Sequence, residues 1–222
     1  MNVAKTAVKA TVWGLFALLM LGCKGSSKGE EDASATTASH SSKAVYVAPE
    51  PGFIKSPGFQ VNEQGRLIDW KFSQHSSNTS YRTSVTNGVL SIARTGAEPW
   101  GKVDQIIKGN SLKPLLGKTL VFSADIKSDF TGEWGLAMEP PAVFVSIKGL
   151  PKGAPALLGA SLLKSIKEPV TDLSAGLVWT RYQLKFSVPS SKEAKVTVLE
   201  LGFLMTEGGT MSIRGPALIE VE

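Results

Sequence analysis

The sequence predicts an all-β domain of the β-sandwich class, behind an N-terminal export signal and a polar connecting segment. Two observations favour this fold class. From about residue 53 onward, apolar and polar residues alternate with the period of two that half-buried strands require. Glycine and proline turns separate these runs at the short spacing that is typical of sandwiches and jelly rolls. We therefore expect a β-sandwich jelly roll over residues 53–222.

The first 22 residues have the three parts of an export signal. Lys5 and Lys9 give a positive start, residues 12–21 are apolar, and Gly22-Cys23 follows directly. An apolar run this short cannot cross a hydrocarbon core, which needs about 20 residues. Residues 1–22 therefore predict a cleaved signal peptide and not a membrane helix.

The end of this signal, Leu19-Met20-Leu21-Gly22-Cys23, resembles a lipobox, the motif whose cysteine is acylated. Cys23 is the one cysteine in the 222 residues, so no disulfide or thiolate metal cluster competes for it. The alternative is an ordinary signal with a chance cysteine. The resemblance implies a palmitate-bearing lipoprotein of the bacterial cell envelope, attached to a membrane through the lipid on Cys23. Because Lys24 and not Asp follows the cysteine, it implies the outer membrane.

The segment after the cysteine is polar. Residues 24–48 are rich in Ser, Ala, Thr, Gly and Lys and cannot bury enough surface to offset the entropy of ordering. We expect residues 23–52 to be the lipidated cysteine and a disordered tether. Loss of Lys5 and Lys9 with the signal lowers the formal charge from +5 to +3. The basic residues are also scattered, so no nucleic-acid partner is expected.

The strands are expected in the following order. Asn87-Gly88, the strongest short hairpin signal, joins strands at 81–85 and 89–94. Residues 179–188 alternate cleanly, and their core face is expected to carry Thr180, Tyr182, Leu184, Phe186 and Val188. The other predicted strands are 103–107, 119–126, 136–138, 143–148, 195–205, 210–214 and 217–221. Residues 154–166 have a helical spacing of apolar residues, which predicts one or two helical turns in a loop.

Five runs follow one another in the chain: GRLIDWKF, NGVLSIARTGAEPWGKVDQII, LGKTLVFSADIKS, VWTRYQLKFSVP and VLELGFLMTEGGTMSIRGPAL. In this order they are similar to the galactose-binding-like jelly roll over residues 58–222. More narrowly, they resemble carbohydrate-binding modules of the family 4 and 9 type. The resemblance implies a domain that binds carbohydrate without catalysis. The opening residues 58–62 carry no acidic cluster, so neither a structural calcium nor another cofactor is expected.

Sugar binding requires flat aromatic rings and planar polar side chains. Trp100 and Trp134 lie in loops, where either ligand stacking or packing accounts for them. The resemblance implies that Gln105 lies on the concave face and contacts a hydroxyl, although a plain surface-strand role fits equally. Arg94, at the end of the preceding strand, is a second candidate for such a contact.

Other polar and aromatic residues are expected to be structural or solvated. Trp70 and Trp179 begin strands and are expected to pack, and His75 lies in a polar loop. The chain carries no nucleophile elbow, phosphate-binding loop or dinucleotide fingerprint. No spacing singles out a glycosidase pair among Glu98, Asp104, Asp125, Asp129, Glu133 and Glu139. We therefore expect a binding protein and not an enzyme.

A second hypothesis concerns residues 149–176, which are longer and more apolar than the corresponding connection in the modules that the chain resembles. The runs Ala156-Leu157-Leu158 and Leu162-Leu163 suggest a surface that another molecule covers. On this alternative the chain is a structural or assembly lipoprotein that binds a protein partner of the cell envelope.

Overall fold

The structure, a computed structural model, describes residues 46–132, 139–155, 157, 159–171 and 178–222. Within these residues, ten strands form two five-stranded antiparallel sheets. Sheet I has the order β1 (Lys71–Gln74), β4 (Gly101–Lys108), β9 (Ala194–Met205), β6 (Ala142–Pro151) and β7 (Ser161–Pro169). Sheet II has the order β2 (Tyr81–Thr86), β3 (Val89–Arg94), β10 (Gly209–Glu220), β5 (Thr119–Phe130) and β8 (Thr180–Ser187).

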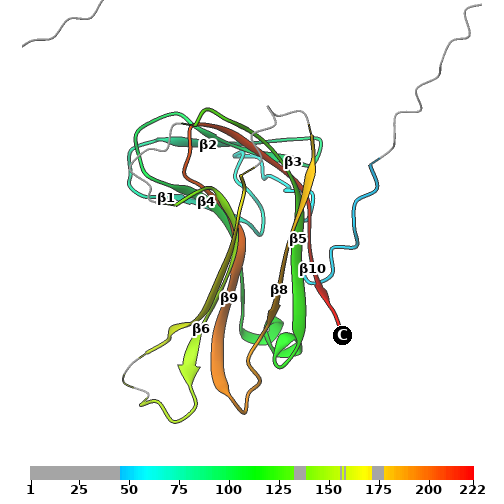
Figure 1. The fold of residues 1–222 in the computed structure, drawn as a ribbon, viewed down its shortest axis with the longest axis vertical. Helices are drawn as coiled ribbons and strands as arrows, with labels where there is room; N and C mark the ends of the chain where they lie inside the picture. Colours follow the sequence, from blue (N-terminus) through cyan, green and yellow to red (C-terminus); the bar gives the residue numbers. More distant parts are fainter. Residues whose placement is uncertain (1–45, 133–138, 156, 158, 172–177) are drawn as a thin grey trace, which may run out of the picture. The chain divides into compact units, whose positions relative to one another are not determined.

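The two sheets form the layers of a sandwich, and neighbouring strands are often distant in the sequence (Figure 1). Two short 3₁₀ turns, η1 (Gly109–Ser111) and η2 (Lys113–Leu115), connect β4 of one sheet to β5 of the other. The inner faces meet in one core, in which the rings of Trp70 and Phe122 both pack on Phe203. This arrangement confirms the predicted all-β jelly-roll sandwich.

The predicted hairpin at Asn87-Gly88 is confirmed. β2 and β3 pair up to Thr86 opposite Val89, which leaves a two-residue turn. Asn87 has φ 51° and Gly88 has φ 74°, and positive values at both positions are what a type I′ turn requires. The turn closes the strands without splaying them, because its twist matches that of the sheet.

The predicted alternation in β8 is also confirmed. Leu184 and Phe186 are buried against the core, whereas Arg181, Gln183 and Lys185 are exposed. At the end of the chain, the strands predicted at 210–214 and 217–221 form the single strand β10, with an irregularity in its register between Arg214 and Ala217. The interruption that the sequence shows is therefore a bulge within one strand and not a turn between two.

The predicted helical turns are wrong for residues 161–166, because these residues belong to strand β7 (Ser161–Pro169). The register between β6 and β7 shifts between Ile147 and Lys148, so that Leu163 has no partner opposite it. Leu163 and Ile166 both pack against the core. A bulge thus puts two residues that are three positions apart on one side of a strand, which imitates the spacing of a helix.

The compact unit extends from Tyr46 to Glu222, so it begins before the expected boundary at residue 53. Residues of the expected tether pack on sheet II: Gly52 forms a parallel bridge with Leu218, and the Tyr46 ring lies against Arg214. The signal residues, Cys23 and the strand expected at 136–138 lie outside the described residues. Where the structure describes the chain, it contains no helix of the length and apolarity needed to span a membrane.

Candidate functional site

The candidate site lies on the outer face of sheet I, where the strand registers align side chains in rows across the sheet. One row runs from Lys71 on β1 through Asp104, Gly202 and Phe144 to Lys167 on β7. The next places Lys102 of β4 opposite Leu204 of β9, and Leu204 opposite Ala142 of β6. A third contains Ile106, Glu200, Ser146 and Ser165. Because side chains alternate across a strand, all of these point away from the core.

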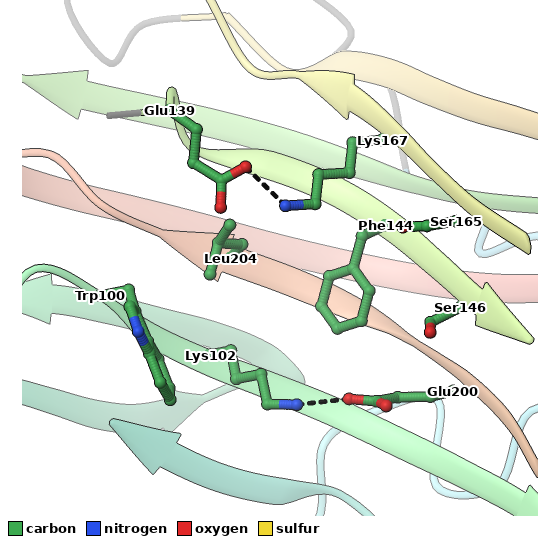
Figure 2. Close-up of a pocket in the computed structure, with 9 residues that line it drawn as sticks. All are labelled: Trp100, Lys102, Glu139, Phe144, Ser146, Ser165, Lys167, Glu200 and Leu204. Atoms are coloured by element: carbon green, nitrogen blue, oxygen red, sulfur yellow. Dashed lines mark hydrogen bonds and ion pairs between the residues drawn. The ribbon is translucent and has the colours of Figure 1, made fainter. Parts of the chain in front are cut away.

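A pocket of about 280 Å³ opens on this face. Figure 2 shows Trp100 on one side of it and the Glu139–Lys167 pair on the other, with Leu204 and Phe144 between them. Leu204 and Phe144 are each 8% exposed and form an apolar floor. The pocket therefore combines an aromatic wall, an apolar floor and charged groups, which is the composition that amphipathic ligands require. Its lining residues are Trp100, Lys102, Glu139, Phe144, Ser146, Ser165, Lys167, Glu200 and Leu204.

Trp100 is held in place by the loop that precedes it. The guanidinium of Arg94 donates hydrogen bonds to the carbonyls of Gly96 (2.9 Å) and Ala97 (3.2 Å) in this loop. The buried Tyr81 hydroxyl donates to the Glu98 carbonyl at 3.1 Å. These contacts fix the backbone on the N-terminal side of Trp100, so the indole projects from a rigid support and not from a free loop.

A second group of contacts supports the indole from the side. The imidazole of His75 meets the Trp100 ring edge-to-face with centroids 6.0 Å apart, and His75 Nδ1 lies 2.8 Å from the Glu98 carboxylate. Hydrogen bonds from Ser76 and His75 hold the pKa of Glu98 below its ordinary value. His75 was expected to be only solvated, but it belongs to the network around Trp100.

Next to Trp100, the pocket contains a network of charged groups on β4, β6 and β9. The ammonium of Lys102 forms a short ion pair with Glu200 and lies 3.2 Å from Oδ1 of Asp104, and Lys148 lies 3.0 Å from the other Glu200 oxygen. Burial raises the pKa of Glu200, but the hydrogen bonds from Lys102 and Lys148 outweigh it and lower that pKa overall. For Asp104, burial is the larger effect and the pKa is raised.

The predicted site residues are not all brought together. Trp100 lies in the pocket, and Arg94 acts through carbonyls of the supporting loop and of Thr206. Gln105 is a correction: it alternates with Asp104 and so faces away from the pocket. Its amide oxygen accepts from the Lys55 amide at 3.0 Å, and its nitrogen donates to the Lys55 carbonyl at 2.9 Å. Gln105 thus fixes the N-terminal segment to β4. Trp134 lies outside the described residues.

The structural expectations for two other tryptophans agree with their positions. Trp70 is buried and donates from Nε1 to the Lys55 and Ser56 carbonyls. Trp179 lies on the outer face of sheet II, where the Arg214 guanidinium stacks on it at 4.1 Å. Among the residues that the structure describes, no cluster of three or more His, Cys, Asp or Glu side chains could hold a metal ion.

Four residues of the pocket were not predicted from the sequence: Lys102, Phe144, Lys167 and Glu200. Strands overlapping β4, β6 and β9 were predicted, but Lys167 lies on β7, next to the segment where helical turns were expected. No strand partner was predicted, and it is the pairing of strands that aligns these side chains. The available signal was the alternation of β4 and β9, in which Lys102 and Glu200 each occupy positions that point away from a strongly apolar face.

No family model matches the sequence, and no curated protein matches it. Similar solved structures include the enzymatically active domain of tailspike protein 4 of bacteriophage CBA120, at 12% identity and a TM-score of 0.48 over 77% of this chain. This chain spans 21% of that chain. They also include a family 4 carbohydrate-binding module, at 17% identity and a TM-score of 0.41, over 76% of this chain and 99% of the module.

A third similar structure is the family 22 xylan-binding domain from Paenibacillus barcinonensis Xyn10C, at 12% identity and a TM-score of 0.41. It matches over 79% of this chain and 99% of that domain. At these identities the similarity concerns the fold. The jelly-roll fold rests on the strand order of the two sheets described above.

Proposed function

We propose that this chain binds carbohydrate, without catalysis, in the pocket on the outer face of sheet I. The observation that carries this proposal is the rigidly supported Trp100 at the wall of an open pocket with apolar and polar lining. A pyranose has an apolar face of C–H groups and a rim of hydroxyls. The apolar face of the sugar stacks on the indole of Trp100, and the polar groups beside the indole bind the sugar hydroxyls.

The polar groups have suitable chemistry for hydroxyl recognition. Ser146 and Ser165 lie directly opposite each other on β6 and β7, and each offers a hydroxyl that both donates and accepts. Lys102 supplies donors and Glu200 supplies acceptors, and their ion pair holds both in place. A side chain that is already fixed loses little entropy when a ligand binds, which favours selective binding.

The absence of catalysis is proposed because the charged groups of the pocket are ion-paired. Glu200 is held ionised by two lysines and so is a poor general acid, and Asp104 is buried beneath the surface of the sheet. A glycosidase instead needs one carboxyl that stays protonated beside the scissile bond.

The binding test is affinity electrophoresis of the full chain through gels that contain soluble polysaccharides. We expect retardation by at least one polysaccharide, and loss of about tenfold or more in affinity for Trp100→Ala, because a central aromatic anchor typically supplies this much. Trp179→Ala is the matched control, since Trp179 lies on the outer face of sheet II. Unchanged retardation of Trp100→Ala, or no retardation by any polysaccharide, would contradict the proposal.

We further propose that Cys23 is lipidated and attaches the chain to a bacterial membrane, which the lipobox-like sequence before it supports. Several acyl chains on one cysteine would hold firmly, because each buried CH₂ contributes about 0.8 kcal/mol. The test is detergent phase partition with labelled palmitate. The wild-type chain is expected to take up label and enter the detergent phase, and Cys23→Ala to do neither. Label on Cys23→Ala would refute this role.

A further inference from the structure

The charged groups around the pocket differ in how far a ligand can reach them. Lysines of four strands line the face: Lys71, Lys102, Lys148 and Lys167. Two of the carboxylates that lie among them are covered, since Asp104 is 1% exposed and the Glu200 side chain is 8% exposed, whereas the third, Glu139, is exposed and pairs with Lys167. Of these three carboxylates, Glu139 is therefore the one that a ligand meets beside the lysines, so the face has a positive character wherever Glu139 is displaced.

The lysines are not equally available. Lys102 is held by Glu200 and Asp104 together, and both of these are buried. Removing a lysine from a buried carboxylate leaves an uncompensated charge, which is strongly unfavourable. Lys148 is bound to the same Glu200. Both lysines are therefore needed by the protein itself and are poor candidates for a new anionic partner.

Lys167 is the exception. Its side chain is 41% exposed, and its partner Glu139 is 49% exposed. An ion pair between two exposed side chains typically contributes only about 0–1 kcal/mol, so a ligand can replace Glu139 at little cost. Figure 2 shows the Lys167 ammonium and the Glu139 carboxylate at the side of the pocket that faces Trp100 across Leu204 and Phe144.

We infer that the saccharide bound at this site is acidic, and that Lys167 binds its anionic group while Trp100 stacks on its ring. This inference rests on the proposed carbohydrate-binding function and specifies its ligand class. The anionic group is the carboxylate of a uronic acid or a sulfate ester, since either accepts hydrogen bonds from an ammonium. Glu139 occupies the position of this group in the free protein, and its displacement makes Lys167 available.

The experiment measures affinity of the full chain, by affinity electrophoresis and titration calorimetry, for polygalacturonate and for the same polymer after methyl esterification. Esterification removes the charge and keeps the sugar backbone. Dextran sulfate and unsubstituted dextran form a second pair, which separates a sulfate preference from a carboxylate preference. We expect the charged member of at least one pair to bind about fivefold or more tightly, and the difference to shrink with added NaCl.

Three variants assign the effect to residues. Lys167→Gln is expected to weaken binding of the acidic polymer about fivefold and to weaken binding of the uncharged polymer clearly less. Glu139→Gln is expected to strengthen binding of the acidic polymer, because it removes the competing carboxylate. Lys164→Gln is the matched control: Lys164 is an exposed lysine of the same strand, but it pairs opposite core-facing Ile147, whereas Lys167 pairs opposite Phe144.

The outcomes separate this inference from the proposed function. If uncharged polysaccharides bind through Trp100 as tightly as charged ones, or if Lys167→Gln and Lys164→Gln behave alike, the acidic ligand is refuted and carbohydrate binding stands. If the chain binds neither kind of polymer, both fail. Stronger binding by Glu139→Gln is the result that a purely structural role of this pair would not produce.

Discussion

Substitution of Gly101 by alanine tests whether the support of Trp100 is as closely packed as the structure indicates. A Cβ at this position would lie 2.6 Å from Cγ of Tyr81 and 2.9 Å from both of its Cδ atoms. Tyr81 is 1% exposed and its hydroxyl is bound to the Glu98 carbonyl, so the ring cannot swing aside. Overpacking of this kind typically costs about 1–3 kcal/mol. We expect Gly101→Ala to lower the free energy of unfolding by that amount.

The assay is urea unfolding followed by tryptophan fluorescence, combined with a double-mutant cycle. Tyr81→Ala alone is expected to cost about 3–5 kcal/mol, since it removes a buried ring. In the double variant the clash is absent. Its decrease in the free energy of unfolding should therefore be smaller, by about 1 kcal/mol or more, than the sum of the decreases in the two single variants. Gly58→Ala is the control, because a Cβ there has no neighbour within 4 Å. Additive losses, or equal effects at Gly101 and Gly58, would refute the packing argument.

Two further predictions concern the N-terminal segment and the charged network. Tyr46→Ala should lower the free energy of unfolding by about 0.5–1 kcal/mol, because the Tyr46 ring stacks on the Arg214 guanidinium at 3.6 Å. Val47→Ala is the control in the same urea assay and should have little effect, because Val47 is 82% exposed. The pKa of Glu200 in the folded chain is below its ordinary value of 4.5. As the pH falls, the Glu200 carboxylate is therefore protonated in the unfolded chain before it is protonated in the folded chain. Its contribution to stability is present above about pH 4.5 and is lost as the pH falls through its lower folded-state pKa, and Glu200→Gln should flatten this acid limb in chemical unfolding measured across pH. An unchanged acid limb in Glu200→Gln would contradict the ion-pair assignment.

Local patterns predicted most of the strands because they act over a few residues. The Asn87-Gly88 turn requires positive φ at both positions, and few other residue pairs accept this. The alternation in β8 likewise follows from one buried and one exposed face. The segment around Leu163 was predicted wrongly for the opposite reason: its pattern depends on a bulge opposite β6, and no local signal distinguishes that from a helix.

The candidate site was predictable only in part. Trp100 was identified because an aromatic residue in a loop after Glu98-Pro99 lacks an obvious packing role. Gln105 was a candidate because of the resemblance to carbohydrate-binding modules, but its amide bonds to the backbone of Lys55 on the side of β4 away from the pocket. Arg94 was a candidate for a ligand contact, and in the structure its guanidinium donates hydrogen bonds to the carbonyls of Gly96 and Ala97.

By itself, the sequence determined the fold class, the hairpin and the inward face of β8, together with the expectation of an N-terminal lipid anchor at Cys23. These follow from residue types and from short periods along the chain. Tertiary structure alone decided which side chains share the pocket, because Lys102, Phe144, Lys167 and Glu200 come from four strands that are distant in sequence. Their alignment is set by the cross-strand register, and register is a property of the whole sheet and not of any one strand.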